Sequence, residues 1–265
     1  MTVSIVDHLR DGDWANVRRL FISLPIIIAV LTVADCRRVS QTDGAKISSQ
    51  SATTGAFVIN PQFDWAGSFS EGLAPVRIGD DKTGRYGFID RTGHFVVNPQ
   101  FDDASSFVNG LAAVRIGDKD TGKWGYIDKQ GHLVVNPQFD RASIFEEGLA
   151  AVRVGDDKTG KVGFVDTSGH FVVNPQFNVV NVWDFWFGGD LRFSEGLAAV
   201  RVGDSESGKV GYVDKQGHLA VPPQFDSAGM FSDGLAAVQI GDDKTGKWGY
   251  IDKQGRFAVN PQFAF

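Results

Sequence analysis

The sequence of 265 residues has a single cysteine and no excess of basic residues, and each scarcity excludes a class of protein. The single cysteine, Cys36, cannot form a disulfide within the chain, so packing and hydrogen bonds must stabilise the fold, and dithiol redox chemistry is excluded. Lys and Arg number 26 against 32 Asp and Glu, which gives a formal net charge of −6. Without a basic field to neutralise phosphates, we expect no nucleic-acid partner.

Glycine and phenylalanine are abundant instead, with 32 and 21 copies. This composition suits short strands joined by tight turns, because aromatic residues favour strands and glycine permits the backbone angles of turns. Hydrophobic residues make up 42% of the chain, which is enough to bury a sizeable core. The composition therefore favours an all-β protein.

The N-terminal segment, residues 1–36, has the layout of an export signal. Arg18 and Arg19 precede residues 20–33 (LFISLPIIIAVLTV), which carry no charge. A membrane-spanning helix needs about 20 apolar residues, so a secretory signal is preferred to a permanent anchor. A buried core helix is disfavoured because Pro25 interrupts the run.

Cys36 follows this segment directly, and residues 31–36 resemble the lipobox of bacterial lipoproteins, whose cysteine is lipidated. That family has a small residue where this chain has Asp35, so ordinary cleavage near Ala34 stays open. Residues 37–55 are rich in Ser, Thr, Gln and Gly and predict a flexible tether. Either reading places residues 56–265 outside the cytoplasm, in the periplasm or cell envelope, with the membrane contacted only through the N-terminal segment.

The rest of the chain, from Phe57, is a tandem repeat. The word Asn-Pro-Gln-Phe, with Pro in place of Asn in the fifth copy, recurs after 38, 38, 38, 48 and 38 residues. Such a period is typical of propellers and solenoids, in which each unit buries its apolar face against its copies. The copies begin at Asn60, Asn98, Asn136, Asn174, Pro222 and Asn260.

One unit, residues 110–139, predicts an antiparallel meander. Residues 111–116 (LAAVRI) form an apolar run typical of a buried strand, and residues 123–128 (KWGYID) form a second strand. Residues 128–131 (DKQG) fit a type I turn, with Asp at its first position and Gly at its fourth.

A third strand begins at His132 and is expected to end at Pro137 or to mark an edge, because proline cannot donate to a ladder. Residues 140–145 have room for one more short strand. Each repeat is therefore expected to contain three or four antiparallel strands.

We expect five tandem repeats of about 38 residues arranged like propeller blades, because this length is near that of a blade and closure hides strand edges. An open β-solenoid is the alternative. The Asn-Pro-Gln-Phe word occurs six times, whereas the Gly-Leu-Ala strand occurs five times. One strand of the third type should therefore remain as an edge cover or latch.

These words resemble the WG-repeat, or KWG-repeat, family, named for a Trp-Gly pair that is present here at Trp124 and Trp248. The resemblance runs from about Phe57 to Phe263 and includes a Phe-x-x-Gly-Leu-Ala word in every unit. It implies bacterial origin, frequent export and a β-rich repeat, and it supplies no catalytic residues. In the other units the Trp position, a packing choice and not a reactive group, holds Tyr86, Val162 and Val210.

Recurring polar residues do not predict a metal site or a cofactor. Equivalent histidines lie about one unit apart, whereas metal ligands must meet at about 2.1 Å from one ion. The aspartates of the hairpin loops lack the spacing of a twelve-residue calcium loop, so solvated loop tips are expected. Recurring arginines are expected to partner carboxylates or aromatic faces. These residues are His94, His132, His170 and His218, and Arg77, Arg115, Arg153 and Arg201.

The sequence favours a binding protein over an enzyme. It has no Ser/His/Asp order, phosphate-binding glycine loop or H-E-x-x-H motif, and an active site usually needs residues that are not repeated in every unit. The preferred function is an exported scaffold that binds a protein or a glycan at the bacterial cell envelope. The alternative is a hydrolase or lyase that acts on envelope polysaccharides through Asp184 and Asp190, which lie outside the repeat.

The longer fourth interval supplies the candidate ligand-binding site. Insertions in repeat arrays map to loops on one face, often the binding face. Aromatic side chains offer a large contact area to proteins and flat faces to sugars. The competing expectation is that these rings fill a gap between units. The insertion carries Trp183, Phe185, Trp186 and Phe187.

Overall fold

The computed structural model describes residues 58–156, 158–178, 191–204, 207–242 and 244–263. All of them lie in one compact unit, Gly55–Phe265. These residues form strands, turns and loops without any helix, so the expected all-β class is confirmed. Within them, accordingly, no helix is long and apolar enough to cross a membrane.

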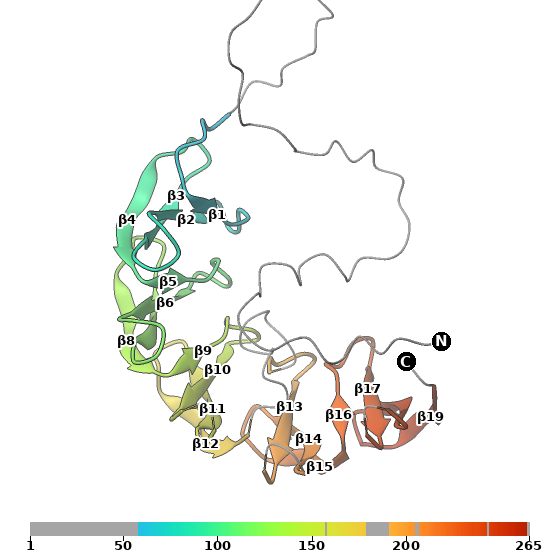
Figure 1. Ribbon diagram of the computed structural model, residues 1–265. Helices are drawn as coiled ribbons and strands as arrows, with labels where there is room; N and C mark the ends of the chain where they lie inside the picture. Colours follow the sequence, from blue (N-terminus) through green and yellow to red (C-terminus); the bar gives the residue numbers. More distant parts are fainter. Residues whose placement is uncertain (1–57, 157, 179–190, 205–206, 243, 264–265) are drawn as a thin grey trace, which may run out of the picture. The chain divides into compact units, whose positions relative to one another are not determined.

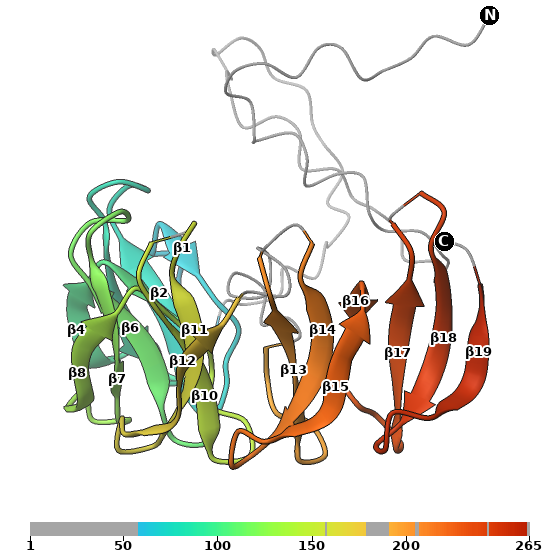
Figure 2. The same cartoon turned by 90° about the horizontal axis from the view of Figure 1, so that it is seen from below.

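The strands form five antiparallel sheets that follow one another in chain order, like blades of a propeller (Figure 1). Within each sheet the strands run alongside one another and neighbours in sequence are neighbours in space (Figure 2). The first sheet contains β1 (Trp65–Ala66), β2 (Ala74–Ile78), β3 (Arg85–Ile89) and β4 (Phe95–Phe101). The second contains β5 (Asp103–Ala104), β6 (Ala112–Ile116), β7 (Lys123–Ile127) and β8 (Leu133–Phe139).

The remaining three sheets repeat this order. The third contains β9 (Arg141–Ala142), β10 (Leu149–Val154), β11 (Lys161–Asp166) and β12 (Phe171–Phe177). The fourth contains β13 (Leu197–Val202), β14 (Lys209–Asp214) and β15 (Leu219–Phe225). The fifth contains β16 (Ser227–Ala228), β17 (Leu235–Ile240), β18 (Lys247–Asp252) and β19 (Phe257–Phe263).

The first two strands predicted for the second unit are confirmed within one residue at their ends. The predicted turn is present too, because the Gly131 amide donates to the Asp128 carbonyl over 3.0 Å. The short fourth strand also exists, as β9, and it pairs with β10 of the next sheet. Where the fourth sheet has no such strand among the described residues, Asn178 forms an isolated bridge with Arg201.

The expectation that the third strand ends at Pro137 is wrong, although β8 does lie at the edge of its sheet. The strand continues to Phe139, which pairs with Trp124, and the register then shifts. This bulge directs the Val135 carbonyl and the Pro137 nitrogen toward Gly125, where a Cβ would lie 2.4 Å from the former and 2.7 Å from the latter. The glycine of the Trp-Gly pair is therefore required by the bulge. Its counterparts in the other units are Gly87, Gly163, Gly211 and Gly249.

An aromatic pair fills each boundary between successive sheets. One ring lies on β3, β7, β11 or β14 of a sheet. The other ring precedes the Gly-Leu-Ala word of the next unit. All eight rings are buried, and such pairs contribute about 0.5–1.5 kcal/mol beyond the area that they bury. The centroid distances are 4.8 Å for Phe88–Phe107, 4.6 Å for Tyr126–Phe145, 4.9 Å for Phe164–Phe193 and 4.8 Å for Tyr212–Phe231.

Ion pairs link successive sheets beside these rings. The Glu71 carboxylate lies 3.0 Å from the Lys129 ammonium of the next sheet and accepts a hydrogen bond from the Gly110 amide. The hydrogen bond from Lys129 lowers the pKa of Glu71. Equivalent 3.0 Å pairs join later boundaries, namely Glu147 with Lys215 and Glu195 with Lys253.

The first Asn-Pro-Gln-Phe word, which begins at Asn60 and precedes the first sheet, covers that sheet. Ile59 and Phe63 pack against the core of that sheet, and the Phe63 ring lies 5.8 Å from the Phe95 ring. The predicted edge cover is thus confirmed. The prediction that it forms a strand is wrong, because residues 58–63 have no strand pairing.

Candidate functional site

The sites predicted from the sequence lie outside the described residues. The four aromatic residues of the insertion belong to residues 179–190, and the lipidation candidate belongs to residues 1–57. The two carboxylates of the enzyme hypothesis also belong to residues 179–190. The predicted site residues outside the described ranges are thus the aromatic residues Trp183, Phe185, Trp186 and Phe187, the lipidation candidate Cys36, and the carboxylates Asp184 and Asp190.

The two ends of the insertion are described, and both are fixed to the array. Before the insertion, Asn178 accepts a hydrogen bond from Lys161 over 2.5 Å. After it, Leu191 is buried in the core, and Arg192 lies 3.6 Å from Glu146 of the third unit. The insertion therefore begins and ends at the boundary between the third and fourth sheets.

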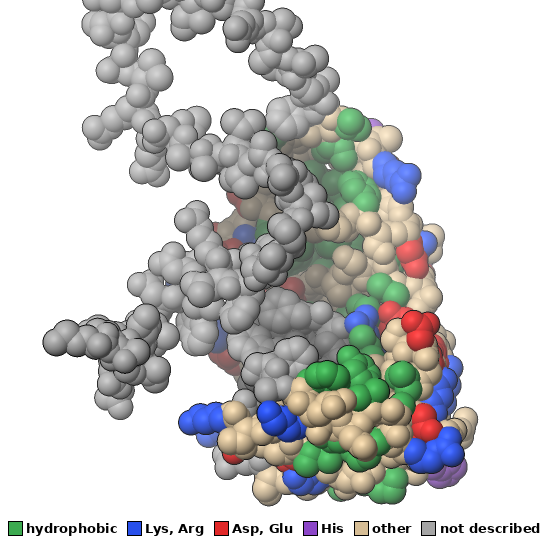
Figure 3. Space-filling view, turned by 90° about the vertical axis from the view of Figure 1, so that its right-hand side faces the viewer, with side chains coloured by type: hydrophobic (Ala, Val, Ile, Leu, Met, Phe, Trp, Pro, Cys, Tyr) green, Lys and Arg blue, Asp and Glu red, His purple; other side chains and the backbone are tan. Residues whose placement is uncertain are grey.

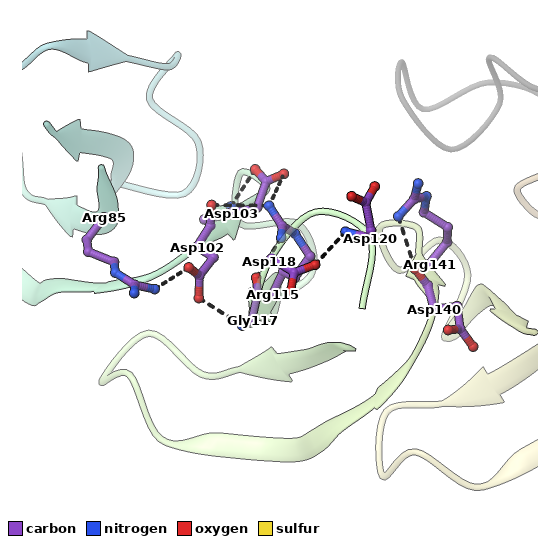
Figure 4. Close-up of polar contacts among 10 residues, drawn as sticks. Arg85, Asp102, Asp103, Arg115, Gly117, Asp118, Asp120, Asp140 and Arg141 are labelled. Atoms are coloured by element: carbon purple, nitrogen blue, oxygen red, sulfur yellow. Dashed lines mark hydrogen bonds and ion pairs between the residues drawn. The ribbon is translucent and has the colours of Figure 1, made fainter. Parts of the chain in front are cut away.

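A cleft of about 240 Å³ lies between the second and third sheets. Its walls are the short strands β5 and β9, together with Arg115 from β6 and Trp124 from β7. A neighbouring cleft of about 390 Å³ is lined by charged residues of the adjoining hairpin loops, and Lys119 and Arg141 border both. Figure 4 shows some of these side chains, with Asp103, Arg115 and Asp120 on the second unit and Arg141 on the third.

Asp103 supplies the carboxylate of the smaller cleft. It is opposite Arg115 in the β5–β6 ladder, and the Arg115 Nη2 atom lies 3.7 Å from its Oδ2 atom. Burial raises the pKa of Asp103, and the neighbouring charges of Arg115 and Arg141 only partly oppose this effect. Burial thus sets Asp103 apart from its neighbour in the next unit, Asp140, whose pKa is lowered.

Arg115 and Trp124, which line the cleft, are positioned by contacts within their own sheet. Arg115 donates to the Gly117 carbonyl over 2.6 Å, and its guanidinium lies 6.0 Å from the centroid of the Trp124 ring. Together with Arg77, which lies 2.5 Å from Asp81 and over the Tyr86 ring, this confirms the roles expected for these two arginines.

The Trp124 indole contributes an aromatic wall to the cleft. Its Nε1 atom is buried and has no acceptor among the described residues, so the ring contributes to this wall through its carbon atoms. The cleft therefore combines a carboxylate, guanidinium groups and an indole ring.

The aspartates at the hairpin tips have a structural role in their own loops. Asp118 accepts hydrogen bonds from the Asp120 amide over 2.8 Å and from the Thr121 amide over 2.7 Å. The Thr121 hydroxyl also donates to it, and these bonds lower the pKa of Asp118 to about 2. In the described ranges, no group of three or more His, Cys, Asp or Glu side chains is placed to hold a metal ion.

The recurring histidines likewise contact their own turns. The His132 Nδ1 atom lies 3.1 Å from the Asp128 carboxylate, and the equivalent distance from His218 to Asp214 is 3.2 Å. In the first and third units the Nδ1 atom contacts a hydroxyl instead, that of Thr92 or Ser168.

Sequence reasoning missed Asp103 and Arg141. They occupy equivalent positions in adjacent units, directly after the Asp that follows Asn-Pro-Gln-Phe. That position holds Trp65 in the first unit and Ser227 in the fifth, so it varies where its neighbours repeat. An alignment of the units would have revealed this variation. Equivalent positions of adjacent units can supply opposite charges to one cleft only where the two units differ in sequence.

The sequence matches a family model described as the WG containing repeat. No curated protein matches the chain. The matched ranges span most of the array and are residues 53–81, 86–119, 124–158, 163–185, 211–244 and 248–265.

Solved structures with distant similarity include TolB from Acinetobacter baumannii, which is 14% identical, with 70% of this chain and 50% of that chain covered and a TM-score of 0.38. A quinonprotein alcohol dehydrogenase-like protein from Bacteroides thetaiotaomicron is 12% identical, with 74% and 54% covered and a TM-score of 0.42. The β-propeller domain of the Trilobed protease from Pyrococcus furiosus is 11% identical, with 72% and 68% covered and a TM-score of 0.42. The chain thus spans about half the length of the first two.

Proposed function

This chain belongs to the family of proteins with WG-containing repeats, and we propose that it is an exported scaffold that binds a glycan or a protein at the bacterial cell envelope. The observation that carries the proposal is the cleft between the second and third sheets. It brings together Asp103 and Arg141, which can bind hydroxyl or amide groups, and the Trp124 ring, which can pack against a sugar ring or an apolar side chain.

The size of the cleft fits a part of a larger ligand. Pockets that enclose whole small molecules usually measure about 300–1,000 Å³, so one of about 240 Å³ suits a single sugar unit or one side chain. The larger charged cleft beside it extends the same surface along the hairpin loops. A polymer such as a glycan, or a protein segment, would contact both.

The binding proposal is tested with soluble glycans and peptides of the cell envelope and three variants of the full chain. Trp124→Phe replaces the indole with a smaller ring, and Arg141→Gln removes a charge from the cleft. An aromatic contact is worth about 0.5–1.5 kcal/mol and a hydrogen bond to a charged group about 1.5–3 kcal/mol, so affinity should fall several-fold in the first variant and about tenfold or more in the second. The matched control is Trp248→Phe, the same change in the fifth unit, where Ser227 replaces the acidic residue. Equal loss in all three variants, or in none, would contradict the role of the cleft.

The location is tested separately by fractionation. If Cys36 is lipidated, the protein should partition with membranes and incorporate a fatty-acid probe, and Cys36→Ala should release it. An unlabelled protein that is retained on membranes and still begins at Met1 would indicate an uncleaved anchor.

One observation favours the enzyme alternative, namely that Asp103 lines a cleft in which burial raises its pKa, the direction of shift that a general acid requires. Glycoside hydrolases normally pair such an acid with a second carboxylate. Turnover of an envelope polysaccharide that is abolished by Asp103→Asn, or by Asp184→Asn in the insertion, would overturn the scaffold proposal.

A further inference from the structure

The first and last sheets of the array expose rings that are buried everywhere else. Phe69, which precedes the first Gly-Leu-Ala word, is 43% exposed, whereas its counterparts in the other units are at most 3% exposed. Tyr250 on β18 is 41% exposed, whereas its counterparts are fully buried. Figure 3 shows hydrophobic side chains gathered over the last sheet, at the lower front of the view. The first sheet thus lacks a preceding partner and the last sheet lacks a following one.

A cavity of about 260 Å³ lies on the exposed face of the first sheet. Phe69, Ala74, Val76 and Ile89 are among the residues that line it. At the next boundary the equivalent four residues form one buried cluster with the fully buried Phe88 ring of the preceding sheet, and they are Phe107, Ala112, Val114 and Ile127. The cavity is therefore the empty form of a site that an aromatic ring fills at each boundary between sheets.

We propose that the last sheet of one molecule docks onto the first sheet of a second copy, with Tyr250 in this cavity. The hydroxyl group has an acceptor there. At the two internal boundaries where the inserted ring is tyrosine, its hydroxyl donates to a backbone carbonyl of the next unit, over 2.8 Å from Tyr126 and 2.7 Å from Tyr212. The equivalent carbonyl in the first unit belongs to Gly67, which lines the cavity.

Charges at the two faces continue the internal pattern. Each internal pair joins an acid before a Gly-Leu-Ala word to a lysine in the turn of the next unit. The last unit supplies the acid Asp233, and the first unit supplies the base Arg91. Neither has an ion-pair partner among the described residues, and the longer arginine side chain compensates for the shorter acid. The same register brings Lys247 to Asp64, as Lys123 meets Asp140 inside the array.

Docking requires the edge cover, residues 58–63, to leave the first sheet. Ile59 lies against the turn glycine Gly93, and at the next boundary Val97 lies in the same way against Gly131. In the docked pair, the counterpart of Val97 on β19 of the first copy would occupy the position that Ile59 holds. The edge cover is the segment that leaves, because β19 is paired along β18 while residues 58–63 have no strand pairing. The cover therefore limits association.

The partner is a second copy because the two faces are both exposed within one chain. If the chain closed on itself, Phe69 and Tyr250 would bury each other, as their counterparts do. The complementarity of rings, charges and register is that of two successive units, so the surface fits another molecule of the same sequence.

The test uses two differently tagged full chains that are produced together and purified through one tag. Co-purification of the other tag is expected, and it should fall about tenfold with Tyr250→Ala. Asp233→Arg alone and Arg91→Asp alone place like charges together and should each have a similar effect. The combination of both reversals in one chain should restore the parental level. Ile59→Asp, which loosens the edge cover, should increase association.

Two results would overturn the proposal. One is association that is absent from both the parent and the Ile59→Asp chain, or that does not respond to the charge reversals. The other comes from a chain with Arg91→Cys and Asp233→Cys treated with a short bismaleimide. A crosslinked monomer without crosslinked dimers would show that the array closes on itself, whereas dimers that carry both tags support docking in trans. The parent chain, with Cys36 alone, is the control for crosslinking.

Discussion

The Tyr126 and Phe145 rings meet across the boundary between the second and third sheets, with their centroids 4.6 Å apart. The Tyr126 hydroxyl donates to the Ser143 carbonyl over 2.8 Å, and burial raises the pKa of this phenol. Each sheet thus buries its aromatic ring only in contact with the next, which makes neighbouring units depend on each other for stability.

Phe145→Ala should destabilise the array by about 3–5 kcal/mol, because it removes a buried ring and leaves a cavity. Phe69→Ala is the matched control, since Phe69 has the same place in its unit but is 43% exposed. Its effect should be below about 1 kcal/mol. Denaturant unfolding measures both, and equal effects would contradict the packing described for the boundaries.

Gly125→Ala should destabilise the second sheet, although alanine loses less backbone entropy on folding than glycine does. The added Cβ would meet backbone atoms of β8 at 2.4 and 2.7 Å, and backbone cannot move aside as a flexible side chain can. At Gly229 the nearest atom to an added Cβ is 3.8 Å away, so Gly229→Ala should leave the melting temperature nearly unchanged. A tolerated Gly125→Ala would show that the bulge is not rigid.

The fold was predictable because its signals repeat. Apolar runs, turn glycines and a fixed period specify the strands of one unit, and the other units confirm the assignment. The continuation of β8 through Pro137 was not predictable in the same way, because a proline normally ends a ladder. The register shift opposite Gly125 forms a bulge, so Pro137 does not need to donate an N–H to the ladder. This arrangement is visible only in the structure.

The candidate site was harder to predict because its residues carry no motif. Asp103 and Arg141 lie far from any catalytic or metal-binding word, and their proximity depends on how two units pack. The place of Trp124 in the wall of the cleft depends on this packing as well. Local sequence patterns specify the strands, whereas the chemistry of a cleft between units depends on which residues differ from one unit to the next.

The adjacent carboxyl groups of Asp102 and Asp103 should respond oppositely to substitution. Burial raises the pKa of Asp103, so its ionised form is unfavourable in the folded state, and Asp103→Asn should maintain or increase stability at pH 7. Asp102 accepts a hydrogen bond from the Gly117 amide over 2.8 Å and pairs with Arg85, so Asp102→Asn should lower stability.

The effect of Asp103→Asn on stability should depend on pH. The unfolded Asp103 ionises at a lower pH than the folded one, so the folded state holds more protons in the window above pH 3.8. Stability from this group therefore falls as the pH rises through that window. The advantage of Asp103→Asn over the parent should be absent near pH 3 and present at pH 7, as measured by denaturant unfolding. An advantage that is independent of pH would contradict the assigned cause.

Asp118→Asn should have the opposite pH profile. Hydrogen bonds from Thr121 and the Asp120 amide hold the pKa of Asp118 at about 2, below its usual value of 3.8. The unfolded state therefore binds more protons between these values, and the carboxylate contributes stability that is complete above about pH 4 and is lost as the pH falls through 2. Asn should be destabilising at pH 7 and nearly neutral close to pH 2. Asp120→Asn in the same loop is the control.

The insertion can be tested by restoring a regular link. In the third unit two residues, Arg141 and Ala142, connect Asp140 to Ser143, and residues 179–190 connect the equivalent positions, Asn178 and Leu191. Because both ends are fixed at the same boundary, replacing residues 179–190 with Arg-Ala should give a folded array with an ordinary short strand.

The competing roles of its aromatic rings then separate in unfolding and binding measurements. If the rings fill a gap between units, Trp186→Ala should lower stability by about 3–5 kcal/mol, and the replacement should do so too. If they contact a ligand, both variants should keep near-native stability and lose binding, because aromatic residues dominate binding hot spots. We expect the loss of binding to add to that of Trp124→Phe only where one ligand contacts both the insertion and the cleft. A replacement that changes neither stability nor binding would remove the insertion as a site and leave the cleft alone.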